Sequence, residues 1–267
     1  KFLLMLAFAL PLSAVAATVD TLMVKSPSMD KEVQVVVVAP DKALGDSAVS
    51  CPVIYLLHGY SGNARSWIEL KPELPQIADE KGIIIVCPDG KNSWYWDSPT
   101  NPAYRYETFV AKELVSYIDE QYNTVASRQG RAVTGLSMGG HGAMWLSIRN
   151  KEVFGAAGSM SGGLDIRPFP QNWEMKKQLG EKESNEELWN RFTAINQLDK
   201  IDNGDLAILI DCGLGDFFLQ VNKDMHEALV ERKIDHDFIL RPGVHNGPYW
   251  KNAVDYQILF FSKFFKR

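Results

Sequence analysis

The stretch RAVTGLSMGGHGAMW, residues 131–145, joins a short apolar run to a segment with helical spacing and places Ser137 among glycines. Its G-x-S-x-G pattern suits a serine at a sharp turn between a strand and a helix, because the two backbones approach closely there and bulky neighbours do not fit. The free N–H groups at the start of the helix would point at an anion formed beside the hydroxyl. Ser137 is therefore the candidate nucleophile, although a serine in a glycine-rich turn is more often purely structural.

Short apolar runs on both sides of this stretch alternate with segments of helical spacing. Runs that are apolar at every position are typical of strands buried on both faces of a parallel sheet. We expect strands at 53–57, 83–87, 132–135, 154–161, 206–210 and 238–241. We expect helices at 75–82, 105–122, 138–150, 218–233 and 252–265. Two further runs, 21–26 and 32–40, predict an N-terminal antiparallel hairpin. The alternation of strands and helices along the chain predicts an α/β fold with helices on both faces of a mostly parallel sheet.

The length and composition fit one domain. With 267 residues, 46% of them hydrophobic, the chain can bury a full core. Its net charge of −5 lacks the basic excess that a nucleic-acid partner requires. No linker or repeat divides residues 17–267. The least regular segment, about 163–200, sets aromatic residues among charges and predicts a cap-like insertion.

Residues 1–16 have the pattern of a secretory signal peptide. Lys1 precedes nine apolar residues, and an A-x-A cleavage pattern follows at 14–16. This apolar run is too short to span a bilayer, which takes roughly 18 residues or more. We therefore expect a secreted or periplasmic protein without stable membrane insertion.

The three cysteines are an odd number for an exported protein. Cys51 precedes one apolar run, whereas Cys87 and Cys212 end two others, so we expect no disulfide. Cysteine and histidine spacings typical of a metal site are absent, and we expect no metal.

A nucleophilic serine needs a base and an acid that orients it, and in this type of fold both follow the serine, the acid first. His245 lies in a Gly/Pro loop after the strand at 238–241, and we favour it over His236, which leads into that strand. For the acid we choose Asp216, in the loop after the strand at 206–210, over Asp211, which still belongs to the strand. Asp216 also suits the start of the following helix.

The oxyanion of an ester intermediate requires two N–H donors. One comes from the residue after the nucleophile, here Met138, and the other from the loop after an earlier strand. His58 and Gly59 end the run at 53–57, which leaves the N–H of Tyr60 as the second donor. The alternative is that this segment is an ordinary turn.

Four motifs together resemble a known family. They are LLHG (56–59), GLSMGGHGAMW (135–145), IDCGLGDFF (210–218) and PGVHNGPYW (242–250). They are similar to the esterase D type group of α/β-hydrolases, which contains S-formylglutathione hydrolases, short-chain acyl esterases, and feruloyl and acetylxylan esterases, with the mycobacterial mycolyltransferases as distant relatives. The resemblance extends from about residue 20 to the C-terminus. It implies the α/β-hydrolase fold, a nucleophile at Ser137, an acid at Asp216, a base at His245, and oxyanion donors at Tyr60 and Met138.

The chain departs from two branches of this family. Its loop HGYSGNARSW, 58–67, is more compact than that of the S-formylglutathione hydrolases, which are cytosolic. Unlike a mycolyltransferase, the chain also lacks any obvious long apolar lid that would shelter a lipid tail.

Four tryptophans are candidates for substrate binding. Trp94 and Trp96 follow the run at 83–87, Trp173 lies in the insertion, and Trp250 is close to His245. Exposed aromatic rings here would stack on a sugar or on an aromatic acyl group. The equally weighted alternative is that these rings close the rim of the core.

The sequence therefore predicts a cofactor-independent serine ester hydrolase for short acyl or hydroxycinnamoyl esters, with small-molecule or oligosaccharide substrates. The alternatives are an acyltransferase of the same fold, an S-formylglutathione hydrolase-like thioesterase and a non-catalytic binding module.

Overall fold

The computed structural model describes residues 17–45 and 47–266. The predicted signal peptide, residues 1–16, lies outside the described residues. Within the described part of the chain, eight strands form one sheet in the order β1-β2-β4-β3-β5-β6-β7-β8. Their bounds are β1 Thr18–Ser26, β2 Lys31–Ala39, β3 Val53–Leu57, β4 Ile84–Pro88, β5 Arg131–Gly135, β6 Ala156–Met160, β7 Ala207–Gly213 and β8 Asp237–Arg241.

The sheet is mostly parallel, with an antiparallel hairpin at one edge. Strands β1 and β2 pair antiparallel over their full lengths, β2 pairs antiparallel with β4, and all the other neighbouring pairs are parallel. In β2 the four consecutive valines at 35–38 are all inaccessible to solvent, which is the two-sided burial that their composition predicts. The predicted sheet and hairpin are thus confirmed.

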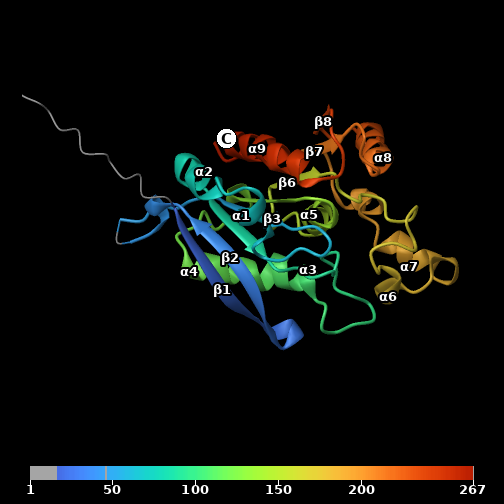
Figure 1. Cartoon of the computed structure of the whole chain (residues 1–267), viewed down its shortest axis with the longest axis horizontal. Helices are drawn as coiled ribbons and strands as arrows, with labels where there is room; N and C mark the ends of the chain where they lie inside the picture. Colours follow the sequence, from blue (N-terminus) through green and yellow to red (C-terminus); the bar gives the residue numbers. More distant parts are fainter. Residues whose placement is uncertain (1–16, 46, 267) are drawn as a thin grey trace, which may run out of the picture.

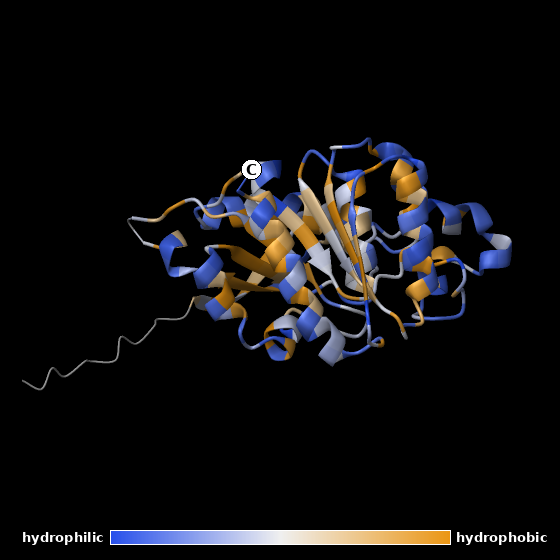
Figure 2. Ribbon diagram, turned by 90° about the horizontal axis from the view of Figure 1, so that it is seen from above, coloured by the Kyte–Doolittle hydropathy of each residue, from blue (hydrophilic) through white to orange (hydrophobic). Residues whose placement is uncertain are grey.

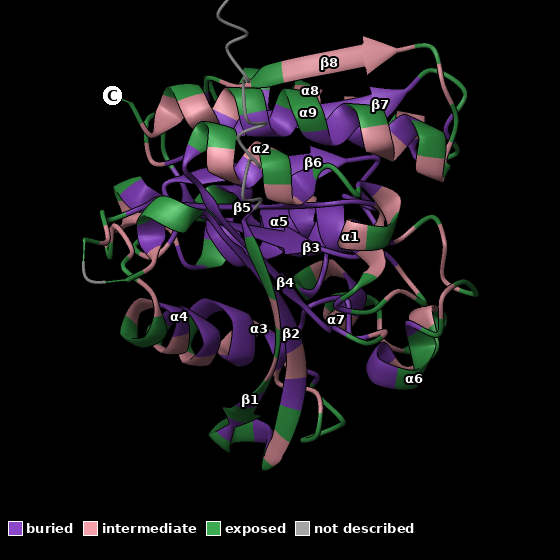
Figure 3. Cartoon of the chain, turned by 60° about the vertical axis from the view of Figure 1, so that its left-hand side comes forward, coloured by how far each residue is buried: buried purple, intermediate pink, exposed green. Residues whose placement is uncertain are grey.

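Helices cover both faces of the sheet, as Figures 1 and 3 show. The longer ones are α2 Leu74–Lys81, α4 Val115–Gln121, α5 Met138–Arg149, α8 Leu219–Glu231 and α9 Gly247–Phe264. The shorter ones are α1 Ser66–Leu70, α3 Tyr106–Thr108, α6 Lys176–Leu179 and α7 Glu186–Arg191. Side chains from α1, α2 and α9 pack on one face, and those from α3, α4, α5 and α8 pack on the other.

The apolar residues concentrate at the sheet, and polar residues cover the outer sides of the helices (Figure 2). The predicted helix at 105–122 forms, with a π-helical turn at Phe109–Leu114 between α3 and α4. Among the described residues, no helix is both long and apolar enough to cross a membrane. The three cysteines are buried and free, as expected.

Candidate functional site

Ser137 lies at the turn between β5 and α5, in a backbone conformation that side chains rarely adopt. Its φ is 55° and its ψ is −116°, a combination found mainly for glycine. A Cβ added at Gly139 would lie 2.5 Å from the carbonyl oxygen of Leu57, and one at Gly135 would lie 2.6 Å from the carbonyl carbon of Gly139. The two glycines of the motif are therefore required by the close approach of strand and helix, as the sequence predicts.

Three side chains from distant parts of the chain meet at this turn. The Nε2 atom of His245 lies 2.9 Å from the Oγ atom of Ser137. The Nδ1 atom of the same ring lies 2.9 Å and 3.0 Å from the two carboxylate oxygens of Asp216. Both the acid and the base lie in loops after the parallel strands β7 and β8, which end at the same edge of the sheet as β5. This topology brings the three predicted residues into one hydrogen-bonded line.

Local contacts hold the acid and the base in place. The backbone N–H of Phe218 donates to the Asp216 carboxylate at 2.8 Å, which forms an Asx turn leading into α8. The His245 ring lies between Phe217, whose centroid is 4.2 Å away, and Trp250, whose ring meets it edge-on at 4.8 Å. The imidazole is therefore fixed by packing as well as by its hydrogen bonds.

The other candidate acid and base residues lie elsewhere. His236 is paired with His226 at 2.7 Å. Asp211, in β7, accepts hydrogen bonds from Tyr249 and Arg241. The structure therefore brings Asp216 and not Asp211 to His245.

The two predicted oxyanion donors border the serine. A Cβ added at Gly59 would lie 3.4 Å from the Cβ of Ser137, so the loop that carries Tyr60 packs against the turn. Met138 is the first residue of α5, where a backbone N–H has no partner inside the helix. Within the described residues, neither the Tyr60 nor the Met138 N–H donates a hydrogen bond to another protein group. Both remain available to an oxygen beside Ser137.

A pocket of about 510 Å³ opens at the serine and the histidine. Its aromatic and aliphatic lining consists of Tyr60, Leu70, Leu136, Trp173, Phe217 and Trp250. Among the described residues, no Asp, Glu, Lys or Arg lines this pocket, so it suits an uncharged ligand. Sequence reasoning missed Phe217, Leu70 and Leu136. Phe217 could have been found from its position directly after Asp216.

The structure corrects the prediction for two of the four tryptophans. Trp173 and Trp250 line the pocket, whereas Trp94 and Trp96 are 1% and 0% exposed and do not. The indole N–H of Trp96 donates to His141 at 3.0 Å, and the two indoles stack on each other with centroids 5.7 Å apart. These two rings belong to the core beneath the site.

The segment 163–200 contains α6, α7 and 3-10 turns, and it carries Trp173 to the pocket. Burial raises the pKa of the Tyr60 hydroxyl, and the neighbouring charge and hydrogen bond of Glu174 raise it further. The segment thus contacts the loop that holds one candidate oxyanion donor. That the segment forms a cap, and the domain boundaries, stay predictions.

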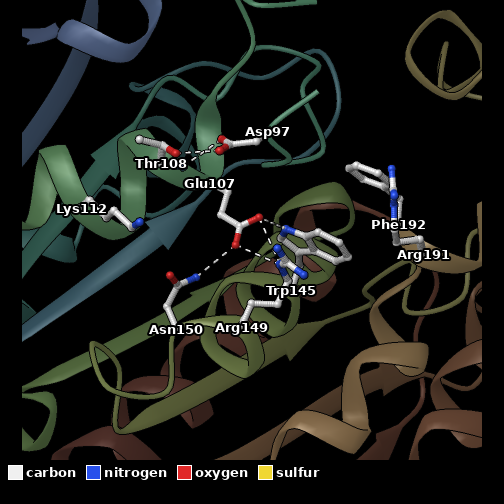
Figure 4. A pocket seen from close by; sticks show the side chains of 9 residues that line it. All are labelled: Asp97, Glu107, Thr108, Lys112, Trp145, Arg149, Asn150, Arg191 and Phe192. Atoms are coloured by element: carbon white, nitrogen blue, oxygen red, sulfur yellow. Dashed lines mark hydrogen bonds and ion pairs between the residues drawn. The ribbon is translucent and has the colours of Figure 1, made fainter. Parts of the chain in front are cut away.

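A second pocket, of about 390 Å³, lies apart from the serine (Figure 4). Its central carboxylate, Glu107, accepts hydrogen bonds from Trp145, Arg149 and Asn150. Arg149 ends α5 whereas Ser137 precedes it, so the helix places Arg149 about 18 Å from the serine at 1.5 Å per residue. Glu107 and Arg149 therefore do not join the line formed by Ser137, His245 and Asp216. Among the described residues, no cluster of three or more His, Cys, Asp or Glu suits a metal ion.

Residues 26–261 match the esterase family, which is described as "Putative esterase". The chain belongs to this family. It is an esterase with the α/β-hydrolase fold. The acetyl esterase of Caldicellulosiruptor saccharolyticus is 24% identical over 75% of this chain and 79% of its own length. The S-formylglutathione hydrolase of Bos taurus is 26% identical over 75% of this chain and 78% of its own length. A solved ferulic acid esterase is 28% identical, with a TM-score of 0.78 over 93% of this chain and 98% of the other.

Proposed function

We propose that this esterase is an exported carboxylic ester hydrolase that acts on short acyl and hydroxycinnamoyl esters, including esters attached to carbohydrate. The observation that carries the proposal is the line from Ser137 through His245 to Asp216, with both nitrogens of the imidazole within 3.0 Å of their partners. Export rests on the sequence pattern of residues 1–16.

In the proposed mechanism, the Ser137 oxygen attacks the ester carbonyl while Nε2 of His245 takes the hydroxyl proton. Asp216 keeps Nδ1 protonated and stabilises the imidazolium. The negative charge on the former carbonyl oxygen is stabilised by the N–H groups of Tyr60 and Met138. The C–O bond to the alcohol then breaks, and His245 returns the proton to the departing oxygen. Water, activated by the same imidazole, hydrolyses the acyl-enzyme and restores the free serine.

The lining of the pocket supports the choice of substrate. An acetyl or hydroxycinnamoyl group is uncharged, and aromatic faces from Trp173 and Phe217 suit a planar ring. A glutathione thioester carries carboxylates and an ammonium, which would find no opposite charge among the lining side chains. This argues against the thioesterase alternative.

The test is a hydrolysis screen of the purified protein with acetyl, butyryl, octanoyl and feruloyl esters, and with acetylated xylan. We expect turnover of acetyl and feruloyl esters, and a loss of about 10⁴-fold or more in kcat for Ser137→Ala or His245→Ala. The double variant should lose little more than either single one, since the two residues act as a unit. His236→Ala is the matched histidine control and should keep its activity.

A folded protein that turns over none of these esters would revive the binding-module alternative. Activity retained by Ser137→Ala would refute the assigned nucleophile. Added alcohol and sugar acceptors distinguish hydrolysis from acyl transfer, because a transferase gives mainly the new ester whereas a hydrolase gives mainly the free acid.

A further inference from the structure

Asp211 is a buried carboxylate that the proposed mechanism does not use. It lies in β7 near the carboxyl edge of the sheet and is 0% exposed. One of its oxygens accepts from the hydroxyl of Tyr249, and the other accepts from the guanidinium of Arg241 at 2.6 Å. Burial raises the pKa of this carboxyl group, while the bonds from Tyr249 and Arg241 oppose the rise. A buried carboxylate costs desolvation free energy, so its presence beside the site calls for a role.

The two partners of Asp211 stand at the two ends of the loop that carries His245. Arg241 is the last residue of β8, and Tyr249 lies in the first turn of α9. The loop passes so close to the Tyr249 ring that a Cβ added at Gly243 would lie 2.2 Å from Cδ2 of that ring. Gly243 itself has a φ of 151°, outside the range that side chains favour. The Asp211 carboxylate therefore hydrogen-bonds to the residues on both sides of a tight loop, and His245 lies within that loop.

The same strand also leads to the acid. Four residues separate Asp211 from Asp216, and the loop between them is hydrogen-bonded to the histidine loop. The N–H of Leu214 donates to the carbonyl of Arg241 at 2.9 Å, and the N–H of Gly215 donates to the carbonyl of Gly243 at 2.8 Å. A shift of the histidine loop would therefore change the distance from His245 to Ser137 and would also disturb the loop that carries Asp216.

We propose that Asp211 is a positioning residue, which aligns His245 between Ser137 and Asp216 by holding the residues on both sides of the loop 242–246. This inference rests on the proposed function, since it concerns the same proton-transfer line. It differs from a purely stabilising role because the geometry of the base, and hence kcat, depends on it. Misplacement of a catalytic group by about 1 Å costs up to about 100-fold in rate.

The first test is Asp211→Asn, which keeps the size of the side chain but removes its charge. We expect kcat for acetyl ester hydrolysis to fall by about 10-fold to 100-fold while KM changes by less than about twofold. Tyr249→Phe removes only the hydroxyl that donates to Asp211, and we expect a smaller fall in kcat, about threefold to tenfold. Should Asp211→Asn fail to fold, Tyr249→Phe alone decides the question.

The matched control is Asp119→Asn. Asp119 also accepts from an arginine and a hydroxyl, Arg131 and Thr124, but at the amino end of β5, the opposite edge of the sheet from Ser137. We expect this variant to lose stability and to keep kcat. A fall in kcat no larger for Asp211→Asn than for Asp119→Asn would overturn the proposal.

Nuclear magnetic resonance of histidine-labelled protein supplies a readout independent of turnover. In the unmodified protein, the Nδ1 proton of His245 should give a far-downfield signal from its bond to Asp216. We expect that signal to shift or disappear in Asp211→Asn and to persist in Asp119→Asn. If the unmodified protein hydrolyses no ester, the proposed function fails, while this signal still tests the positioning role. An unchanged signal in Asp211→Asn would refute that role.

Discussion

Replacing Ser137 by glycine should leave the protein more stable than replacing it by alanine, although both changes abolish activity. The serine has a φ of 55° and a ψ of −116°, where a side chain is strained by about 1–3 kcal/mol. Glycine adopts this conformation without strain, but it costs about 0.5–1 kcal/mol in backbone entropy on folding. The difference leaves the free energy of unfolding of Ser137→Gly roughly 1 kcal/mol above that of Ser137→Ala.

Ser137→Ala is the matched control, because alanine keeps the Cβ and hence the strain. Both variants lose the hydrogen bond from the serine hydroxyl to His245, so that loss cancels in the comparison. For a protein of this size, about 1 kcal/mol corresponds to about 2–4 °C in Tm. We therefore expect Ser137→Gly to melt about 2–4 °C above Ser137→Ala, measured by circular dichroism and by urea denaturation at neutral pH.

The refuting result is a glycine variant that melts at or below the temperature of the alanine variant. It would mean that the turn between β5 and α5 is not strained at Ser137. The packed strand and helix would then not hold Ser137 in a costly conformation. Activity cannot decide this point, since both variants lack the hydroxyl.

Two further predictions follow from named contacts. Phe217→Ala removes a ring that is 53% exposed and stacks on Trp173. The value of kcat/KM should therefore fall about threefold to tenfold more for methyl ferulate than for p-nitrophenyl acetate. Equal losses for the two substrates would contradict aromatic recognition. Burial lowers the pKa of His141 to about 4. Between pH 6.5 and 4 the imidazole of His141 is therefore protonated in the unfolded chain but stays neutral in the folded protein. The free energy of unfolding should therefore fall by roughly 3 kcal/mol between pH 6.5 and 4, and urea midpoints should show a shallower fall for His141→Gln.

Much of the fold and the arrangement of Ser137, His245 and Asp216 could be predicted because the relevant signals are local or topological. The strands of the parallel sheet are apolar at every position, and Gly135 and Gly139 mark the turn that carries Ser137. Parallel strands end at one edge of the sheet, so loops after β7 and β8 had to lie near the loop after β5. That rule alone favoured Asp216 and His245 over Asp211 and His236.

The aromatic residues could not be placed in the same way, because no periodicity sets the direction of a side chain in a loop. Trp94 has a φ of 58° and Tyr95 a φ of 59°, and this pair of left-handed residues turns the segment so that both rings enter the core. Phe217 and Phe218 are adjacent, yet they are 53% and 1% exposed. Composition near the sheet edge identified a group of aromatic residues, whereas only the backbone conformation decides which of them face the pocket.

Several of the described residues with positive φ lie in the loops that follow strands of the sheet. Ser61 follows β3, Trp94 and Tyr95 follow β4, Ser137 follows β5 and Ser161 follows β6, and all have positive φ. Each of these strands is buried along its whole length, so the sheet resists the relaxation that would relieve the loops. The strain is local, whereas the burial that sustains it is spread over the core. A stable, two-sided sheet is therefore a physical condition for holding a serine in a conformation that its own backbone disfavours.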